Sequence, residues 1–355
     1  MQPARKSMYL TIALALVFAG LAGCSAFEDS SYKNTGDFPE TAYEYAKLVE
    51  PILGVPPKID LASGTELPMY VDGVQTHGVL WSSKDCDNPT RLGKFCISGS
   101  VVQRYEGRTA SGEPLPNVVW VSFGRNASFS FAGRLFVLGS VQMIGYDRES
   151  GATAFFESTD DIDSWATLDD THRLIGQMPW TDDPDEFNRA FSPPPDSFQC
   201  VACHQNDPFI HNDYIDAAKI AGTDDPVVPT VSARERIPGL DLPYYVIGGE
   251  RWDMRTIHIE DNQCLSCHRV GMGTAALFIN NGWHPNEHMP PRKPGTMADD
   301  WADLQACWQN TPEHTPGCEW VIPRAGETWG KVVGKEYPFK QPFNEVGKEA
   351  LGFGA

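Results

Sequence analysis

The sequence predicts an α+β protein in which an N-terminal antiparallel β-domain, a sandwich or a barrel-like fold, precedes a loop-rich and partly helical C-terminal domain. Three observations lead to this prediction. The chain has 355 residues, which is long enough for two domains with separate cores. Short apolar runs alternate with turn residues between Met69 and Glu157, without helical patterns between them. The 28 proline and 32 glycine residues indicate short elements and much irregular backbone.

The first residues are typical of an exported protein. Two basic residues precede an apolar run at 8–22, which is too short for a comfortable membrane span. The run ends in Leu-Ala-Gly-Cys at 21–24, and this tetrapeptide resembles the lipobox of bacterial lipoproteins. The resemblance implies that residues 1–23 are a signal peptide and that Cys24 is lipidated, with an incidental cysteine after a simple signal peptide as the alternative. Ser25 then favours the outer membrane, because retention in the inner membrane is expected to need aspartate there.

The next two stretches are predicted to be a tether and a β-rich domain. Residues 24–50 begin polar and form the tether, which ends in a short helix over 42–49. Residues 51–160 form the β-rich domain, because runs of β-branched and aromatic residues are separated by Gly, Pro, Asn and Asp. The strands predicted in it are 69–71, 78–81, 97–105, 118–123, 129–131, 134–138, 141–146 and 152–156.

An acidic and then proline-rich stretch at 161–195 is predicted to link the two domains. Carboxylates gather around 160–170 and again at 182–186, and neither group has the spacing of an EF-hand loop. We interpret them as a solvated charged surface, with calcium binding as the alternative. The stiff Ser-Pro-Pro-Pro segment at 192–195 then leads into the C-terminal domain.

The C-terminal domain, predicted over 196–355, contains one pentapeptide pattern twice: Cys200-Val-Ala-Cys203-His204 and Cys264-Leu-Ser-Cys267-His268. This C-x-x-C-H pattern is that of c-type haem attachment. Two thiols one turn apart reach the two vinyl groups of one porphyrin, and the adjacent imidazole binds the iron as the proximal ligand. A lone C-x-x-C also suits a redox dithiol or half of a zinc site, but the same pattern twice, with a histidine each time, favours haem. The sequence therefore predicts two covalently bound haem c groups with His204 and His268 as proximal ligands.

The sixth ligand of each iron decides between two kinds of function. Two strong ligands indicate electron transfer, whereas an open position indicates chemistry on a bound molecule. His211 and His258 are candidate distal ligands by their positions near the motifs, and so are His288 and Met289. Met289 is followed by two prolines, which resembles the ligand loop of many c-type cytochromes. The alternative for the last pair is a packed proline-rich loop whose histidine is exposed.

The remaining cysteines fit an oxidising compartment. The chain has nine, of which four belong to the haem motifs and Cys24 to the lipobox. The other four form two pairs that are close in sequence, Cys86 with Cys96 and Cys307 with Cys318. We predict these two disulfides from proximity alone, since four cysteines allow three connectivities.

The charge balance bears on the partners. A net charge of −19 argues against nucleic acid and against anionic lipid surfaces. It favours a redox partner protein, either a basic protein, which the field of the chain would attract, or another cytochrome. Simple solubility is an equally good explanation of the charge.

Together the two motifs resemble those of dihaem c-type cytochromes, and the lipobox adds the anchor of a bacterial lipoprotein. The resemblance covers the motifs and their flanks, well under half of the chain. It implies an exported, lipid-anchored protein that transfers electrons at the cell envelope. Two alternatives remain: a haem enzyme (a peroxidase or another small-molecule oxidoreductase) with one open iron, and a binding module whose β-domain docks a partner. Bacterial dihaem peroxidases usually carry their motifs further apart, on two similar domains.

Overall fold

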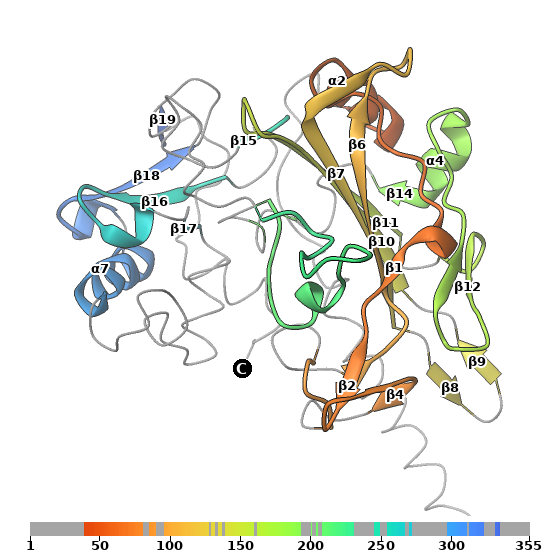
Figure 1. Ribbon diagram of the computed structural model, residues 1–355. Helices are drawn as coiled ribbons and strands as arrows, with labels where there is room; N and C mark the ends of the chain where they lie inside the picture. Colours follow the sequence, from red (N-terminus) through yellow and green to blue (C-terminus); the bar gives the residue numbers. More distant parts are fainter. Residues whose placement is uncertain are drawn as a thin grey trace, which may run out of the picture.

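The computed structural model of the chain describes residues 39–80, 85–89, 96–127, 129–131, 134–136, 139–159, 162–192, 200, 204, 208–230, 245–248, 254–266, 270–271, 297–310, 312–322 and 331–333. Among these residues β-strands predominate, with three α-helices, α2 (Ala42–Leu53), α4 (Pro184–Ala190) and α7 (Ala298–Gln309) (Figure 1). The α+β class predicted from the sequence is thereby confirmed. Short 3-10 turns are η1 (Leu61–Ser63), η3 (Ile215–Ala217), η5 (Gln263–Ser266) and η6 (Pro312–His314).

The largest sheet, here called the main sheet, has seven strands in the order β1-β6-β7-β10-β11-β14, with β15 also beside β11. All of its pairs are antiparallel except β11 with β15. The strands β1 and β14 lie at opposite ends of this order, so the described strands form an open sheet and the barrel-like prediction is wrong for them. The bounds are β1 (Thr65–Glu66), β6 (Val101–Arg108), β7 (Pro114–Asn126), β10 (Gly139–Asp147), β11 (Ala152–Ser158), β14 (Phe191–Ser192) and β15 (Tyr245–Val246).

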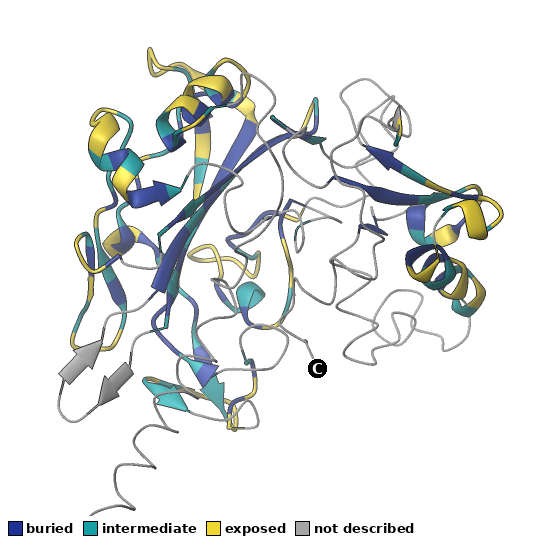
Figure 2. Ribbon diagram, turned by 180° about the vertical axis from the view of Figure 1, so that it is seen from behind, coloured by how far each residue is buried: buried dark blue, intermediate teal, exposed yellow. Residues whose placement is uncertain are grey.

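The two faces of the main sheet fill two different cores, because successive residues of a strand point to opposite faces. Trp120 and Phe156 belong to the core that includes α2 and α4. Their neighbours Val121 and Phe155 belong to a second core, which includes Cys200 of the first motif. Figure 2 shows these long strands as largely buried. Part of the C-terminal region therefore covers the face on which a sandwich would place a second sheet.

The helix predicted over 42–49 is confirmed as α2. It begins with a capping box, in which the Thr41 hydroxyl accepts from Glu44 N at 3.1 Å and the Glu44 carboxylate accepts from Thr41 N at 3.2 Å. One face of α2 packs on the main sheet, and Trp120 Nε1 donates to the Leu53 carbonyl at 3.1 Å. The helix is thus the first element of the folded core, although the sequence places most of it at the end of the tether.

The stretch predicted as an acidic linker contains regular structure. It holds a hairpin of β12 (Ala166–Leu168) and β13 (Leu174–Gly176), then α4 and β14. Asp183 caps α4 by accepting from Glu186 N at 3.2 Å, and Asp169 accepts from Arg173 N at 3.0 Å in the hairpin turn. At least two of these carboxylates, Asp169 and Asp183, therefore stabilise a turn and a helix start by accepting backbone hydrogen bonds. The described residues contain no group of three or more side chains of the kinds that bind metals.

A second, smaller unit lies beside the main sheet and is here called the α7 lobe (Figure 1). Its sheet has the order β17-β16-β18-β19, and α7 packs on that sheet. None of the described helices is long and apolar enough to cross a membrane. The strands of the lobe are β16 (Thr256–Ile259), β17 (Val270–Gly271), β18 (Cys318–Ile322) and β19 (Lys331–Val332).

Both predicted disulfides are confirmed. Cys86 and Cys96, with Cα atoms 5.9 Å apart, close a loop beside short hairpins. Cys307 and Cys318, with Cα atoms 5.8 Å apart, join α7 to β18, so this bond links a helix to a strand. The remaining short strands pair as β2 (Met69–Val71) with β3 (Val74–Thr76), β4 (Val79–Leu80) with β5 (Cys96–Ile97), and β8 (Phe129–Phe131) with β9 (Arg134–Phe136).

Replacing Phe156 by alanine tests the core between the main sheet and its helices. The Phe156 ring is 1% exposed and lies 5.0 Å from the ring of Tyr45 and 6.1 Å from those of Trp120 and Phe187. We expect a loss of about 3–5 kcal/mol in the free energy of unfolding, measured by urea denaturation. Val74→Ala, at a strongly exposed site, is the control and should change it by less than about 0.5 kcal/mol. Equal effects of the two substitutions would contradict this assignment of the core.

Candidate functional site

One backbone hydrogen bond links the two described residues of the first motif, Cys200 and His204. His204 N donates to the Cys200 carbonyl at 2.9 Å, the i to i−4 bond of an α-helix. Two thioether bonds to one porphyrin need cysteines about one helical turn apart, which is the spacing that the motif has in the sequence. Cys203, the second predicted attachment residue, lies outside the described residues.

A hydrogen bond to a backbone carbonyl orients the His204 imidazole, as is common for histidines that bind a metal. Its Nδ1 lies 2.9 Å from the Pro208 carbonyl, which can only accept, so Nδ1 carries the proton and the lone pair is on Nε2. Metal-binding histidines commonly donate their second ring N–H to a carbonyl in this way. Burial lowers the pKa of His204 to about 4, with the Pro208 bond opposing and the Arg125 charge adding to the shift. The ring is therefore neutral at pH 7, the form that binds a metal.

Strand β11 packs against the described residues of the first motif. The Phe155 ring lies 5.5 Å from the His204 ring, between centroids, and the Cys200 thiol lies 3.8 Å from a carboxylate oxygen of Glu157. Phe155 and Cys200 belong to the second core of the main sheet. The motif is thus placed against the sheet by apolar packing, with one carboxylate beside its first thiol.

The second motif is placed by the N-terminal end of α7. Cys264 lies in η5, and its backbone N–H donates to Asn262 Oδ1 at 3.1 Å. The Asn262 amide in turn donates to the Asp300 carbonyl at 2.9 Å, and Asp300 Oδ1 accepts from Gln263 N at 2.8 Å. These bonds fix the entry into the motif against the helix. Cys267 and His268 lie outside the described residues.

The core of the α7 lobe packs against Cys264, the first cysteine of the second motif. Cys264 packs against a buried cluster that contains Trp301, Trp308 and the disulfide between helix and strand. The indole N–H of Trp308 is buried and has no hydrogen-bond partner within the described part of the chain. An unpaired buried donor is unusual, and a haem carboxylate is a group that it would fit. Cys264 thus lies against apolar side chains and near the buried indole N–H of Trp308, which has no partner within the described residues.

Two of the candidate distal ligands lie within the described residues. His211 has Nδ1 at 2.7 Å from Asp216 Oδ1 and Nε2 at 3.3 Å from the Pro229 carbonyl, so iron ligation would require one of these contacts to break. His258 lies on β16, 3.6 Å from Glu319. Its neighbours on the strand point into the lobe core, so His258 projects from the opposite face of that sheet. Ligation by these two residues stays a prediction.

Other predicted site residues lie in parts that the structure does not describe. They are Cys24, the predicted lipidation site, and the distal candidates His288 and Met289.

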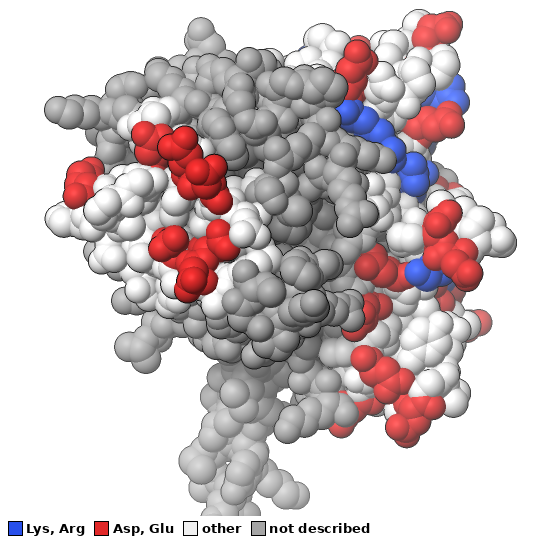
Figure 3. Space-filling view, turned by 60° about the vertical axis from the view of Figure 1, so that its left-hand side comes forward, with Lys and Arg blue, Asp and Glu red and all other residues white. Residues whose placement is uncertain are grey.

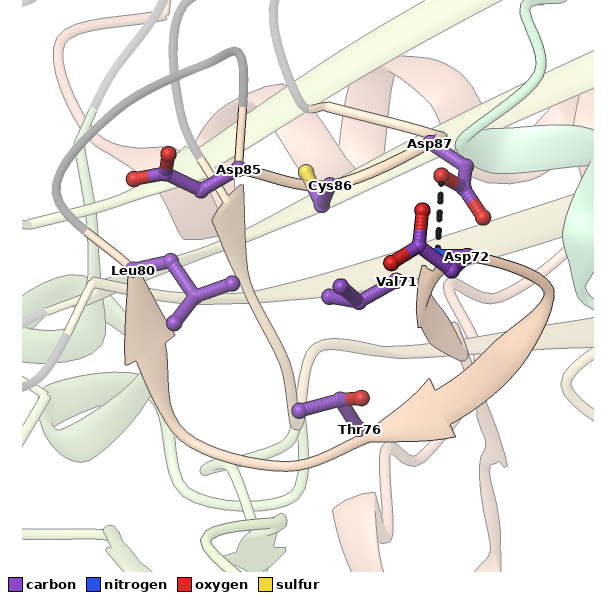
Figure 4. Close-up of a pocket in the computed structure, with 7 residues that line it drawn as sticks. All are labelled: Val71, Asp72, Thr76, Leu80, Asp85, Cys86 and Asp87. Carbon is purple, nitrogen blue, oxygen red and sulfur yellow. Dashed lines mark hydrogen bonds between the residues drawn. The ribbon is translucent and has the colours of Figure 1, made fainter.

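A pocket of about 440 Å³ lies away from the motifs, at the loop closed by the first disulfide (Figure 4). Val71, Thr76, Leu80 and Cys86 line it together with three aspartates, Asp72, Asp85 and Asp87. The Asp87 carboxylate accepts from the backbone N–H groups of Asp72 and Gly73, at 3.2 and 2.8 Å. It therefore holds the β2–β3 turn, in which Asp72 has a φ of 50°. This is a structural role, and we assign no function to the pocket.

Sequence reasoning missed the residues that support the motifs. Phe155 and Glu157 contact the first motif from a strand more than 40 residues earlier, since Glu157 and Cys200 are 43 positions apart. Asp300 lies 37 positions after Gln263. Only Asn262 carries a local signal, because asparagine two residues before a turn commonly accepts from the backbone there.

No family model matches the chain, and it matches no curated protein and no solved structure. The functional argument therefore rests on the motifs and on their surroundings.

Asn262→Ala tests how the second attachment site is held. The substitution removes the acceptor for Cys264 N and the donor to the Asp300 carbonyl, so the haem attachment predicted at Cys264 should fall while that predicted at Cys200 is unchanged. Mass spectrometry of proteolytic peptides measures both occupancies in one sample. Asn310→Ala is the matched control, because exposed Asn310 bonds only locally, to the Ala306 carbonyl at the far end of α7. A parallel decrease at both motifs would show that Asn262 has no local role.

Proposed function

We propose that this protein is an exported, lipid-anchored c-type cytochrome that carries two haems and transfers electrons at the bacterial cell envelope. One observation carries the proposal. In the first of two C-x-x-C-H motifs, His204 N bonds back to the Cys200 carbonyl, and the His204 ring donates Nδ1–H to a carbonyl and keeps Nε2 for a metal. A redox dithiol needs no such histidine, and its presence after both C-x-x-C sequences supports the same assignment for the second motif.

The chain would hold the two groups through its motifs. A bound haem supplies an iron that gains and loses one electron. Around it, the residues of this chain fix the porphyrin by thioethers, orient the imidazole through the Pro208 carbonyl, and exclude water with Phe155 and Trp301. The predicted attachment residues are Cys200, Cys203, Cys264 and Cys267, with His204 and His268 as proximal ligands.

The placement outside the cytoplasm is supported by two independent features. The lipobox-like sequence around Cys24 implies an exported lipoprotein, and the following serine favours the outer membrane. Both non-motif cysteine pairs form disulfides, which persist in oxidising compartments such as the periplasm. Covalent haem attachment also requires export, so all three properties agree.

The α7 lobe supports a basic redox partner. Among the described residues of the lobe the only lysine and arginine residues are Arg255, which is fully buried, and Lys331 on β19. Figure 3 shows acidic groups and no basic ones on the described surface of the lobe. A surface of one sign raises the encounter rate with a partner of the opposite sign. The exposed carboxylates here are Glu260, Asp261, Asp299, Asp303, Glu313 and Glu319.

Haem counting tests the cofactor. The full chain, produced in a bacterium that attaches c-type haem, should contain two haems by its pyridine haemochrome spectrum and by intact mass. Replacing Cys264 and Cys267 by serine should leave one, because a porphyrin then has no thiol to bond at that motif. Replacing Cys86 and Cys96 by serine is the control and should leave two. A wild-type chain without covalent haem would overturn the proposal.

The spectrum of the same sample separates a carrier from an enzyme. Low-spin haems in absorption and magnetic circular dichroism, without uptake of carbon monoxide, are expected for a carrier with both distal positions filled. A high-spin haem that binds carbon monoxide would instead support the haem enzyme.

Charge reversal tests the partner surface. Asp299→Lys combined with Asp303→Lys should slow electron transfer to a small basic c-type cytochrome by about tenfold at low salt, measured by stopped flow. The difference should vanish at high salt, because exposed charges are screened. Asp182→Lys with Asp185→Lys, at the start of α4, is the matched control. An equal effect of both pairs would mean that only net charge matters and that the lobe is not the docking surface.

A further inference from the structure

Strand β18 reaches from the core beside one motif to the core beside the other. At its start, Cys318 belongs to the buried cluster against which Cys264 of the second motif packs. At its end, Ile322 belongs to the cluster that includes Cys200 of the first motif. The strand has five residues, so its two ends lie about 13 Å apart at a rise of about 3.3 Å per residue. The two motif cysteines therefore pack against cores that are close together.

Strand β16 makes the same connection beside β18 (Figure 1). The two strands are antiparallel, with Ile257 opposite Trp320 and Ile259 opposite Cys318. Met254, just before β16, packs in the core of the first motif, whereas Ile257 packs in the core of the α7 lobe. Two paired strands therefore link the cores, and the hydrogen bonds between them hold their register.

Arg255 is fully buried between these two cores. It is 0% exposed, and in the chain it lies between Met254 and Ile257. Its guanidinium lies 5.2 Å from the centre of the Trp320 ring, which packs against the cluster that includes Cys318. A cation over an aromatic ring is attracted more strongly when the pair is shielded from water. The contact thus holds the start of β16 against β18, at the junction of the lobe and the main sheet.

A buried guanidinium is not explained by stability alone. Burial of a charge costs free energy, and a well-packed apolar side chain of similar volume is often as stabilising or more so. What the guanidinium adds is direction, because its planar group stacks on an aromatic ring and donates hydrogen bonds in fixed directions. Arg255 is therefore suited to hold one arrangement of the lobe on the main sheet.

We propose that Arg255 is a positioning residue, which fixes the spacing of the two haem sites so that an electron passes directly between them within one molecule. The inference rests on the proposed function and adds an internal step to it. In this step one electron is lost at one motif and gained at the other, and no bond forms or breaks.

The same spacing makes the two sites interact electrostatically. Two unit charges about 13 Å apart, at an effective dielectric constant of about 20, change each other's equilibrium by about tenfold. Reduction of one haem should therefore make reduction of the other about tenfold less favourable. The effect falls as the distance grows, so it reports the spacing that Arg255 fixes.

Two measurements on the full holoprotein test the spacing. Pulsed electron paramagnetic resonance of the oxidised protein gives the distance between the two irons. A redox titration followed by nuclear magnetic resonance shows how far reduction of one haem hinders reduction of the other. In the wild-type chain we expect one narrow range of distances and an interaction of about tenfold. Arg255→Met keeps a long side chain and removes the charge, so it should widen the range of distances and weaken the interaction.

Arg189→Met is the matched control. The Arg189 guanidinium lies 5.6 Å from the centre of the Trp165 ring, but on α4, and Trp165 packs on the other face of the main sheet. This substitution should change neither measurement. Arg255→Lys keeps the charge and should recover most of the narrow range. Trp320→Leu removes the same contact from β18 and should act like Arg255→Met, which keeps the test open if the buried substitution does not fold.

The outcomes separate this inference from the proposed function. A wild-type chain without covalent haem overturns both. Two haems whose distance range and interaction are the same in the wild type, Arg255→Met and Trp320→Leu overturn the inference alone, and so does an equal effect of Arg189→Met. A wider range and a weaker interaction in Arg255→Met, restored by Arg255→Lys, support it.

Discussion

The fold depends on the apolar contact between one face of the main sheet and the segment that carries the first motif. Val119, Val121 and Phe155 face this side, and Cys200 and Phe209 cover them. Burial of each such side chain contributes about 1.5–3 kcal/mol, and a seven-stranded sheet with helices on only one face would leave this surface in water. The segment that carries the first motif is therefore part of the core of the main sheet, and the sheet needs it to bury this face.

This contact joins two regions that the sequence separates at about 195. β15, from the C-terminal region, extends the main sheet by pairing in parallel with β11, with Tyr245 opposite Ala152. Met254 packs in the core shared with the main sheet, and Ile257, three residues later, packs in the α7 lobe. Between them lies fully buried Arg255, whose guanidinium is 5.2 Å from the Trp320 ring centre. The chain thus passes from the core of one motif to that of the other within a few residues.

Local patterns in the sequence predicted local structure well. Apolar runs between turn residues predicted the long strands, a short helix was predicted over 42–49 where α2 lies, and proximity predicted both disulfides. The helix α4 was missed although Asp183 and Pro184 form a standard helix start, because the surrounding acidic residues suggested a solvated linker. Two long-range contacts could not be predicted from the sequence: the contact of Glu157 with Cys200 and the pairing of β11 with β15. A strand pattern shows that one face of a strand is buried, but it does not show which segment covers that face.

The charges around the two motifs differ, and on the proposed function this difference gives electron transfer a direction. Reduction adds negative charge to a haem, so nearby cations raise its potential and nearby anions lower it. The charge of Arg125 lowers the pKa of His204, whereas the described residues shortly before Cys264 and at the start of α7 include the exposed carboxylates Glu260, Asp261 and Asp299. Salt weakens the influence of the exposed carboxylates more than that of half-buried Arg125. On the proposed function, the haem of the first motif is then expected to have the higher potential and to receive electrons from the haem of the second motif.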